Sequence, residues 1–266
     1  MLIQKKSLSQ VFLTKPLIIK KIIDVLSINE DETVIEIGSG LGYLTKVISK
    51  QCKKVIAIEI DSELIKLAKI NIVSSNVFFI NEDILKVDLL ELFKKETLDC
   101  KKIKIIGNLP YSIATKIVLK ILNYHDYFSK FVFMLQWEMA ERFVALPNTK
   151  KYNDLTVKLN FYAETKIEFK LKPNNFIPRP LVNSAIISGK MNKNLPYLQN
   201  ESNFWLFVKK MFSYKRKILL NNLKYEKKID KDEWKKQFID MNWSINKRAE
   251  ECNWLDFMKL FRLLNK

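Results

Sequence analysis

The stretch "VIEIGSGLGYLT" (residues 34–45) decides how the first two-thirds of this chain is expected to fold. It begins in an apolar, β-branched run, and Gly38, Gly40 and Gly42 follow at once. The whole chain has only 5 glycines, so three within five residues is not an effect of composition. Glycines after a strand let backbone N–H groups approach a ligand, and the next helix presents its positive end. We therefore predict a strand, a ligand-binding loop and a helix.

The same alternation of strand and helix continues along the sequence. Apolar runs rich in β-branched and aromatic residues predict strands at 33–37, 54–60, 76–80, 102–108, 130–137, 164–171 and 184–190. Helical patterns between them stand at 43–50, 62–72 and 112–123, the last with Ser112 as its N-cap. Strands that are apolar on both faces are typical of a parallel sheet covered on both sides. The prediction is an α/β fold, a doubly wound, Rossmann-like sheet.

After about residue 190 the pattern predicts helices alone. They are expected at 203–223, 231–241 and 253–264, and Asp230 and Glu233 have the spacing of a capping box. We therefore divide the chain into a sheet domain, residues 1–190, and a smaller helical domain, residues 191–266.

The glycine spacing separates two kinds of nucleoside-containing ligand. A dinucleotide loop, Gly-x-Gly-x-x-Gly, would need glycine where Tyr43 stands. The form found here, Gly-x-Gly-x-Gly, favours S-adenosylmethionine (SAM). Glu59 ends the second strand, where an acidic residue in such folds accepts hydrogen bonds from ribose hydroxyls. Asp83 follows the third strand and could accept from the adenine amino group.

The stretch "GNLPY" (107–111) follows the fourth strand and should face the same crevice. The side-chain oxygen of Asn108 and the carbonyl of Leu109 can both accept hydrogen bonds from an exocyclic amine, and Pro110 fixes the chain so that they converge. Tyr111 offers a flat face on which a base can stack. Because two acceptors would restore the lone pair of an aromatic amine, these residues indicate a site of amino-group methylation. The alternative is a turn that ends a strand, with a packed tyrosine.

Composition and charge exclude several classes of protein. The 46 Lys and Arg against 29 Asp and Glu give a net charge of +17, which favours a polyanionic partner such as nucleic acid, although a soluble lysine surface is an alternative. His125 is the only histidine, and Cys52, Cys100 and Cys252 are scattered. A histidine-based triad, a metal site and a disulfide framework are therefore not expected. No apolar run has the length of a membrane span, so a cytoplasmic protein is expected.

A series of motifs runs in order along nearly the whole chain: "SQVFL" (9–13), "EIGSGLGYLT" (36–45), "IEID" (58–61), "EDIL" (82–85), "GNLPYSI" (107–113), "FMLQWEMAERF" (133–143), "NNFIPRPLVNSAII" (174–187), "FSYKRKILLNNL" (212–223) and "RAE" (248–250). In these motifs the chain resembles the KsgA-type small-subunit rRNA adenine dimethyltransferases. The resemblance implies transfer of four methyl groups from SAM to N6 of two adjacent adenosines in a hairpin near the 3′ end of 16S rRNA. It also implies a helical domain that docks the small ribosomal subunit, a monomer, and no metal.

Matching positions carry the family's roles. SAM would contact Val11, Leu13, Gly38, Gly40, Glu59, Asp83, Ile84 and Asn108. The target adenine would be held by Asn108, Leu109, Pro110 and Tyr111, with Phe176 as a second stacking aromatic. RNA would contact Arg142, Arg179, Lys215, Arg216, Lys217 and Arg248. Val11 departs from the polar residue of many relatives. Arg142 and Arg248 could instead form intramolecular ion pairs, and 214–217 could be a solvated helix face.

Three other functions remain as alternatives. Resistance-type dimethyltransferases modify large-subunit rRNA with the same chemistry, but they usually have isoleucine where this chain has Leu109 and lack an equivalent of residues 212–223. A non-catalytic role in subunit assembly could replace catalysis or accompany it. A dehydrogenase is the third alternative, which tight binding of NAD without binding of SAM would favour.

Overall fold

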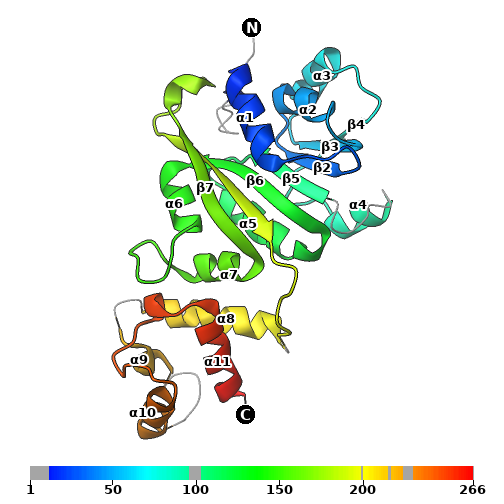
Figure 1. Cartoon of the computed structure of the whole chain (residues 1–266). Helices are drawn as coiled ribbons and strands as arrows, with labels where there is room; N and C mark the ends of the chain where they lie inside the picture. The colour runs from blue at the N-terminus through cyan, green and yellow to red at the C-terminus, as the bar shows by residue number, and fades with distance from the viewer. Residues whose placement is uncertain (1–11, 96–102, 199, 215–216, 224–229, 266) are drawn as a thin grey trace. The chain divides into compact units, whose positions relative to one another are not determined.

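The computed structural model describes residues 12–95, 103–198, 200–214, 217–223 and 230–265. The chain divides into two compact units: the first consists of Met1–Ala140 and Tyr162–Lys193, the second of Glu141–Phe161 and Asn194–Lys266. Residues 141–161 therefore group with the C-terminal helices, although they precede the last two long strands. Figure 1 shows the elements of both units.

The first unit is built on a sheet of seven strands in the order β4-β3-β2-β5-β6-β9-β7. These strands are β2 (Thr33–Ile37), β3 (Lys54–Glu59), β4 (Val77–Asn81), β5 (Ile103–Asn108), β6 (Phe128–Gln136), β7 (Ala163–Leu171) and β9 (Ser184–Met191). All seven predicted strands are present. The first five pair in parallel, but β9 is antiparallel to both β6 and β7, so the sheet is mixed. A separate two-stranded ladder pairs β1 (Phe12–Leu13) with β8 (Phe176–Ile177).

Helices flank this sheet and bury its apolar residues. They are α1 (Pro16–Leu26), α2 (Tyr43–Ile48), α3 (Ser62–Asn71), α4 (Leu89–Lys95), α5 (Ala114–Leu122), α6 (Trp137–Phe143), which runs on into the second unit, and the 3-10 turns His125–Tyr127 and Pro173–Asn175. Ile19, Ile22 and Ile23 of α1 pack in one core with Val34 of β2 and Val132 of β6. Successive strand residues point to opposite faces, so the equally buried Ile105 and Phe133 are covered from the other side.

The second unit is helical. Its elements are α7 (Asp154–Tyr162, whose last residue belongs to the first unit), α8 (Glu201–Phe212), α9 (Leu219–Leu223), α10 (Lys231–Asp240), the 3-10 turn Ala249–Glu251 and α11 (Trp254–Leu264). An aromatic core holds it together, with Phe204 against Phe261 and Phe207 against Phe257. The Tyr152 hydroxyl donates to the carbonyl of Cys252 at 2.9 Å, so the segment 141–161 is tied to the C-terminal helices.

Three predictions about helix ends were wrong. The helix expected over 203–223 is two helices, because α8 ends at Phe212 and Ile218 pairs with Arg248 in an isolated β-bridge before α9 begins. Ser112 does not cap α5, which begins after Ile113 without a side-chain cap. Asp230 does cap α10, but its carboxylate accepts from the backbone N–H of Asp232 rather than from Glu233.

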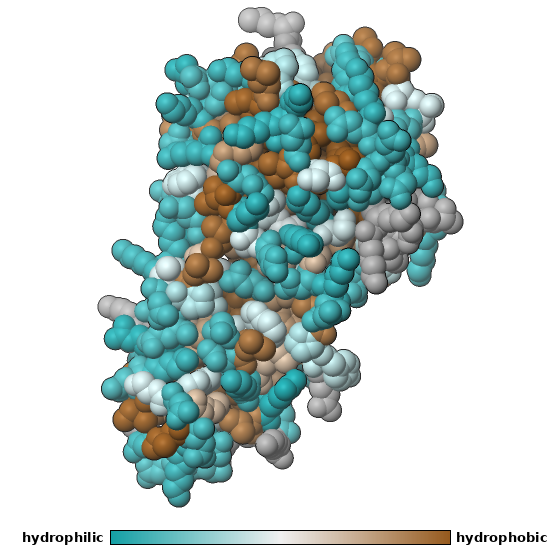
Figure 2. Space-filling model, viewed as in Figure 1, coloured by the Kyte–Doolittle hydropathy of each residue, from teal (hydrophilic) through white to brown (hydrophobic). Residues whose placement is uncertain are grey.

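Most of the face seen in Figure 2 is hydrophilic. Among the described residues, no helix is both long and apolar enough to cross a membrane.

Candidate active site

A cavity of about 280 Å³ lies in the first unit, at the carboxyl ends of β2, β3, β4 and β5. Parallel strands bring their carboxyl ends to one edge of a sheet, which is where ligands bind in doubly wound folds. The predicted residues that line it are Leu13, Gly38, Gly40, Glu59, Asp83, Ile84, Asn108, Leu109, Pro110 and Tyr111. The structure therefore brings together five segments of the chain, of which the first and the last, at Leu13 and Tyr111, lie about 100 residues apart.

The glycine loop has the backbone that its sequence predicts. Gly38, Gly40 and Gly42 have φ values of +71°, +55° and +79°, in the left-handed region that favours glycine. A Cβ on Gly42 would lie 2.5 Å from Cδ1 of Ile72, so this glycine also allows α2 to approach the end of α3. A Cβ on Gly38 would meet only the carbonyl oxygen of Asn108, at 3.6 Å. The absence of a side chain at Gly38 therefore leaves open space beside the cavity. The absence of one at Gly42 leaves no open space, because Ile72 packs there.

Glu59 connects the glycine loop to the end of β3. One carboxylate oxygen accepts from the backbone N–H of Gly40 at 2.9 Å, and the other accepts from the N–H of Asp61 at 3.0 Å. The side chain is buried, with 7% of its residue exposed, and it lines the cavity. A carboxylate has about four lone-pair positions, so each oxygen retains one for a ligand. Glu59 is therefore held in place and still able to accept hydrogen bonds.

Asp83 and Ile84 form the wall beyond β4. The Asp83 carboxylate accepts from the N–H of Leu85 at 2.9 Å, which fixes a turn, and Ile84 is 6% exposed. The side chain of Asn81 donates to the carbonyls of Glu59 and Ile60 and joins the ends of β4 and β3. A buried aliphatic side chain beside an acceptor is a suitable environment for a purine ring and its amino group.

The "GNLPY" turn leaves β5 beside the glycine loop. A Cβ on Gly107 would lie 2.8 Å from the carbonyl oxygen of Ile37, so glycine is required for the close approach of β5 and β2. The N–H of Leu109 donates to Met134 of β6 at 3.2 Å, and the carbonyl of Pro110 accepts from Ile113 at 3.1 Å. Asn108 is half-buried and lies on the cavity wall. The Tyr111 hydroxyl lies 3.0 Å from that of Ser184.

Phe176 does not reach this cavity. It is 4% exposed and packs in the core with Leu13, its partner in the β1–β8 ladder, and with Ile186. Its neighbour Ile177 is 63% exposed. This arrangement gives Phe176 a packing position and does not support the predicted role in stacking. Val11 lies outside the described residues.

The whole chain matches a known family of proteins. The model for "Ribosomal RNA adenine dimethylase" covers residues 1–266. The chain belongs to the ribosomal RNA adenine dimethylase family. It is therefore similar in sequence and in fold to SAM-dependent methyltransferases of ribosomal RNA, as the "GNLPY" turn and the glycine loop predict.

Individual relatives agree with this membership. The chain is 41% identical to "Ribosomal RNA small subunit methyltransferase A" of Metamycoplasma arthritidis, with 98% of this chain and 96% of the relative covered. It is 40% identical to the protein of the same name from Ureaplasma parvum, with 99% and 95% covered. The solved dimethyladenosine transferase from Plasmodium falciparum superposes with a TM-score of 0.80 at 25% identity, over 96% and 97% of the two chains. The 23S rRNA methyltransferase ErmE has a TM-score of 0.75 at 20% identity, covering 96% and 100%, which shows the shared fold.

Among the cavity residues of this dimethylase that were not predicted from the sequence are Glu36, Ser39 and Phe12. Glu36, the fourth of the five residues of β2, is 1% exposed. Burial raises the pKa of its carboxyl to about 7, although a hydrogen bond from the Thr45 hydroxyl at 2.5 Å opposes this. The Ser39 hydroxyl is buried and has no hydrogen-bond partner among the described residues. Phe12 covers Gly40. Of these three residues, only Glu36 had a signal in the sequence, since it is a carboxylate inside an apolar strand.

The residues predicted to contact RNA belong to both units. Arg179 is exposed in the first unit, and Arg142, Lys217 and Arg248 are exposed in the second. Within the described part of the chain, neither Arg142 nor Arg248 forms an ion pair, so the alternative reading of these two residues is not supported. The Lys217 ammonium lies 4.7 Å from the ring centre of Tyr214. Lys215 and Arg216 lie outside the described residues.

Proposed function

We propose that this family member transfers methyl groups from SAM to N6 of two adjacent adenosines in the 3′-terminal hairpin of small-subunit rRNA, in the cytoplasm and as a monomer. The observation that carries the proposal is the shared wall of one cavity, where the glycine loop, Glu59, Asp83 and the "GNLPY" turn meet. The names of relatives at about 40% identity over the full chain support the small subunit as the target.

The lining residues fit SAM. Ser39 has a buried hydroxyl without a partner among the described residues, and such a group would be satisfied by a hydrogen bond with a ligand or water. Glu59 would accept from the ribose hydroxyls, Asp83 from the adenine amino group, and Ile84 would pack on the purine. When bound, SAM supplies a methyl group on a positively charged sulfur. Gly38 leaves the space that the ligand needs beside Asn108.

Asn108 and Leu109 would act on the nucleophile. The amine of adenine is a poor nucleophile because its lone pair is delocalised into the ring. Acceptance of its two N–H bonds by the Asn108 side chain and a carbonyl of the turn would reverse part of that delocalisation. The residues would also align the nitrogen with the methyl group, and alignment contributes more here than a strong base, since the product amine loses its proton readily. Tyr111 would stack on the base.

The helical unit would dock the ribosomal subunit. Its exposed Arg142, Lys217 and Arg248, and the exposed Arg179 of the sheet unit, carry charge that can pair with phosphate. We propose the functional division at residues 190 and 191, with the segment 141–161 associated with docking because it belongs to the same compact unit.

The test uses radiolabelled SAM and small subunits from a strain that lacks this modification, followed by nuclease digestion and mass spectrometry. We expect dimethyladenosine at two adjacent positions near the 3′ end. Label on large-subunit rRNA would instead favour the resistance-type function. SAM binding without incorporation into either subunit would favour a non-catalytic role in assembly.

A further inference from the structure

One hydrogen bond links the "GNLPY" turn to a strand 73 residues away in the sequence. The hydroxyl oxygens of Tyr111 and Ser184 lie 3.0 Å apart, and either can be the donor. Tyr111 lines the cavity and is half-buried, whereas Ser184 is fully buried. The bond therefore connects a side chain at the edge of the site to the interior of the sheet.

Ser184 is held on both sides by backbone pairing. It is the first residue of β9, in register with Gln136 of β6 and with Leu171 of β7. The carbonyl of the preceding Asn183 accepts from the N–H of Trp137 at 2.9 Å. A residue between two paired strands has little freedom to move, so its hydroxyl is a fixed point.

The direction of β9 explains why this fixed point lies near the site. Because β9 is antiparallel to β6, its first residue lies at the edge where the parallel strands end. A parallel strand would bring its last residue there. The antiparallel direction of β9 therefore places the buried Ser184 hydroxyl at the same edge of the sheet as the cavity.

Tyr111 has few other polar or aromatic restraints. Within the described part of the chain, no aromatic ring packs against it and its side chain makes no second hydrogen bond. A tyrosine turns about two side-chain torsions, and a contact at the far end of the ring limits both. Loss of the hydroxyl contact would leave the plane of the ring free to tilt.

We propose that Ser184 is a positioning residue that fixes the plane of the Tyr111 ring for stacking on the target adenine. This inference rests on the proposed function, in which Tyr111 contacts the base. Ser184 acts only through Tyr111 and touches neither the base nor the methyl donor. It follows that removal of either hydroxyl should have the same effect, and that removal of both should add nothing.

The test is a double-mutant cycle with Tyr111→Phe, Ser184→Ala and the double variant, measured as methyl transfer to small subunits. One hydrogen bond is worth about 1 kcal/mol, so each single variant should lose about 2- to 10-fold in kcat. The double variant should lose no more than either single one. KM for SAM should not change, because the contact does not involve the SAM-binding residues. A loss of packing or stability alone would not produce this separation of kcat from KM.

Ser188→Ala is the matched control. Ser188 is a buried serine on the same strand, and it donates to Glu168 away from the cavity. Its substitution should leave kcat unchanged. Losses that multiply in the double variant, or single variants with wild-type kcat, would overturn the inference.

Tyr111→Ala separates this inference from the proposed function. If Tyr111→Ala is inactive while Tyr111→Phe and Ser184→Ala are fully active, Tyr111 stacks on the base without help from Ser184. If Tyr111→Ala itself retains full activity, the assignment of Tyr111 to the target base fails as well.

Discussion

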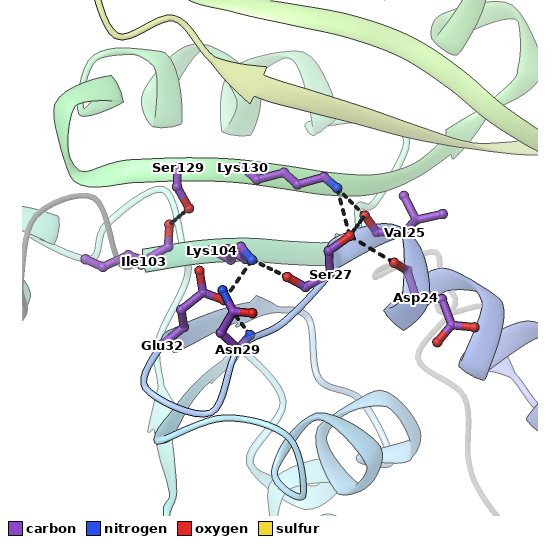
Figure 3. Close-up of polar contacts among 9 residues, drawn as sticks. All are labelled: Asp24, Val25, Ser27, Asn29, Glu32, Ile103, Lys104, Ser129 and Lys130. Carbon is purple, nitrogen blue, oxygen red and sulfur yellow. Dashed lines mark hydrogen bonds and ion pairs between the residues drawn. The ribbon is translucent and has the colours of Figure 1, made fainter.

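Two buried carboxylates, one near each end of strand β2, differ in whether a cation lies beside them. Glu32, just before the strand, lies 2.7 Å from the ammonium of Lys104, and both side chains are less than 10% exposed. Figure 3 shows that Lys104 also donates to the carbonyl of Ser27, and that Lys130 donates to the carbonyl of Val25 at the end of α1. Four residues further on, Glu36 has no cation beside it among the described residues, and its pKa is raised to about 7.

This difference distinguishes the amino end of β2, where buried charges are paired, from the carboxyl ends of the strands, where the cavity lies. At the amino end of β2, the protein pairs its own buried charges, Glu32 with Lys104. At the carboxyl ends, some buried polar groups keep free positions: the Ser39 hydroxyl has no partner among the described residues, and each oxygen of Glu59 retains an acceptor position. A buried polar group without a partner costs free energy, and a ligand that pairs with the group would recover that cost.

Lys104→Met should have the largest effect on stability. Removal of one partner leaves the Glu32 carboxylate buried and unpaired, so the free energy of unfolding should fall by about 3–5 kcal/mol in urea titrations. The matched control is Lys66→Met, because Lys66 and Glu63 form an exposed pair at 2.8 Å, and no measurable change is expected there. Equal effects of the two substitutions would contradict the structural role of Lys104. The specific activity of folded Lys104→Met should remain that of the wild type.

Glu36 should make stability depend on pH in the acid range. The folded protein holds a proton on Glu36 up to about pH 7, whereas the unfolded chain releases it near pH 4.5. The unfolded state therefore binds fewer protons in this window, and stability falls as the pH rises through it and is constant above. Glu36→Gln stays neutral, so relative to the wild type it should gain about 3 kcal/mol between pH 4.5 and pH 7. A constant difference between the two proteins across this range would contradict the raised pKa.

Gly42→Ala and Gly38→Ala should show which glycine is needed for helix packing and which for the space that SAM would occupy. Both positions have positive φ, but only at Gly42 would the new Cβ meet a neighbour closer than 3.0 Å. We expect Gly42→Ala to lose about 2 kcal/mol or more of stability through strain and overpacking, and Gly38→Ala about 1 kcal/mol. SAM binding measured by calorimetry should be weakened more by Gly38→Ala. The reverse order in either measurement would show that the two glycines have been assigned wrongly.

Phe176→Leu should have the smallest effect. Because Phe176 packs in the core and does not line the cavity, this substitution should cost about 1 kcal/mol in stability and should leave methyl transfer within twofold of the wild type. A strong loss of transfer with little change in stability would support the stacking role that the resemblance implies.

The sequence predicted which residues would meet at one cavity better than it predicted the details of packing. Glycine spacing, the acid at the end of the second strand and the "GNLPY" turn depend on local chemistry, and residues from all three line one cavity. The strands were equally clear, because buried parallel strands are continuous apolar runs. Helix ends were less clear: Ser112 has the residue type of a cap, but α5 begins after Ile113.

Other features depend on contacts between distant residues and could not be predicted. The raised pKa of Glu36 results from burial by the whole fold. The bond between Tyr111 and Ser184 depends on the antiparallel direction of β9, which the apolar pattern of that strand does not reveal. Phe176 has the residue type of a stacking aromatic, yet the β1–β8 pairing places it in the core.

The most direct test of the proposed catalytic role of this end of the sheet is Asn108→Ala, measured as methyl transfer to small subunits at saturating SAM, with SAM affinity determined on the same preparation. Asn108 would accept a hydrogen bond from the reacting amine, so we expect transfer to fall by about 10²- to 10³-fold while SAM binding and the thermal midpoint stay close to those of the wild type. Formation of dimethyladenosine by Asn108→Ala at the wild-type rate would contradict the assignment of the reaction to this end of the sheet.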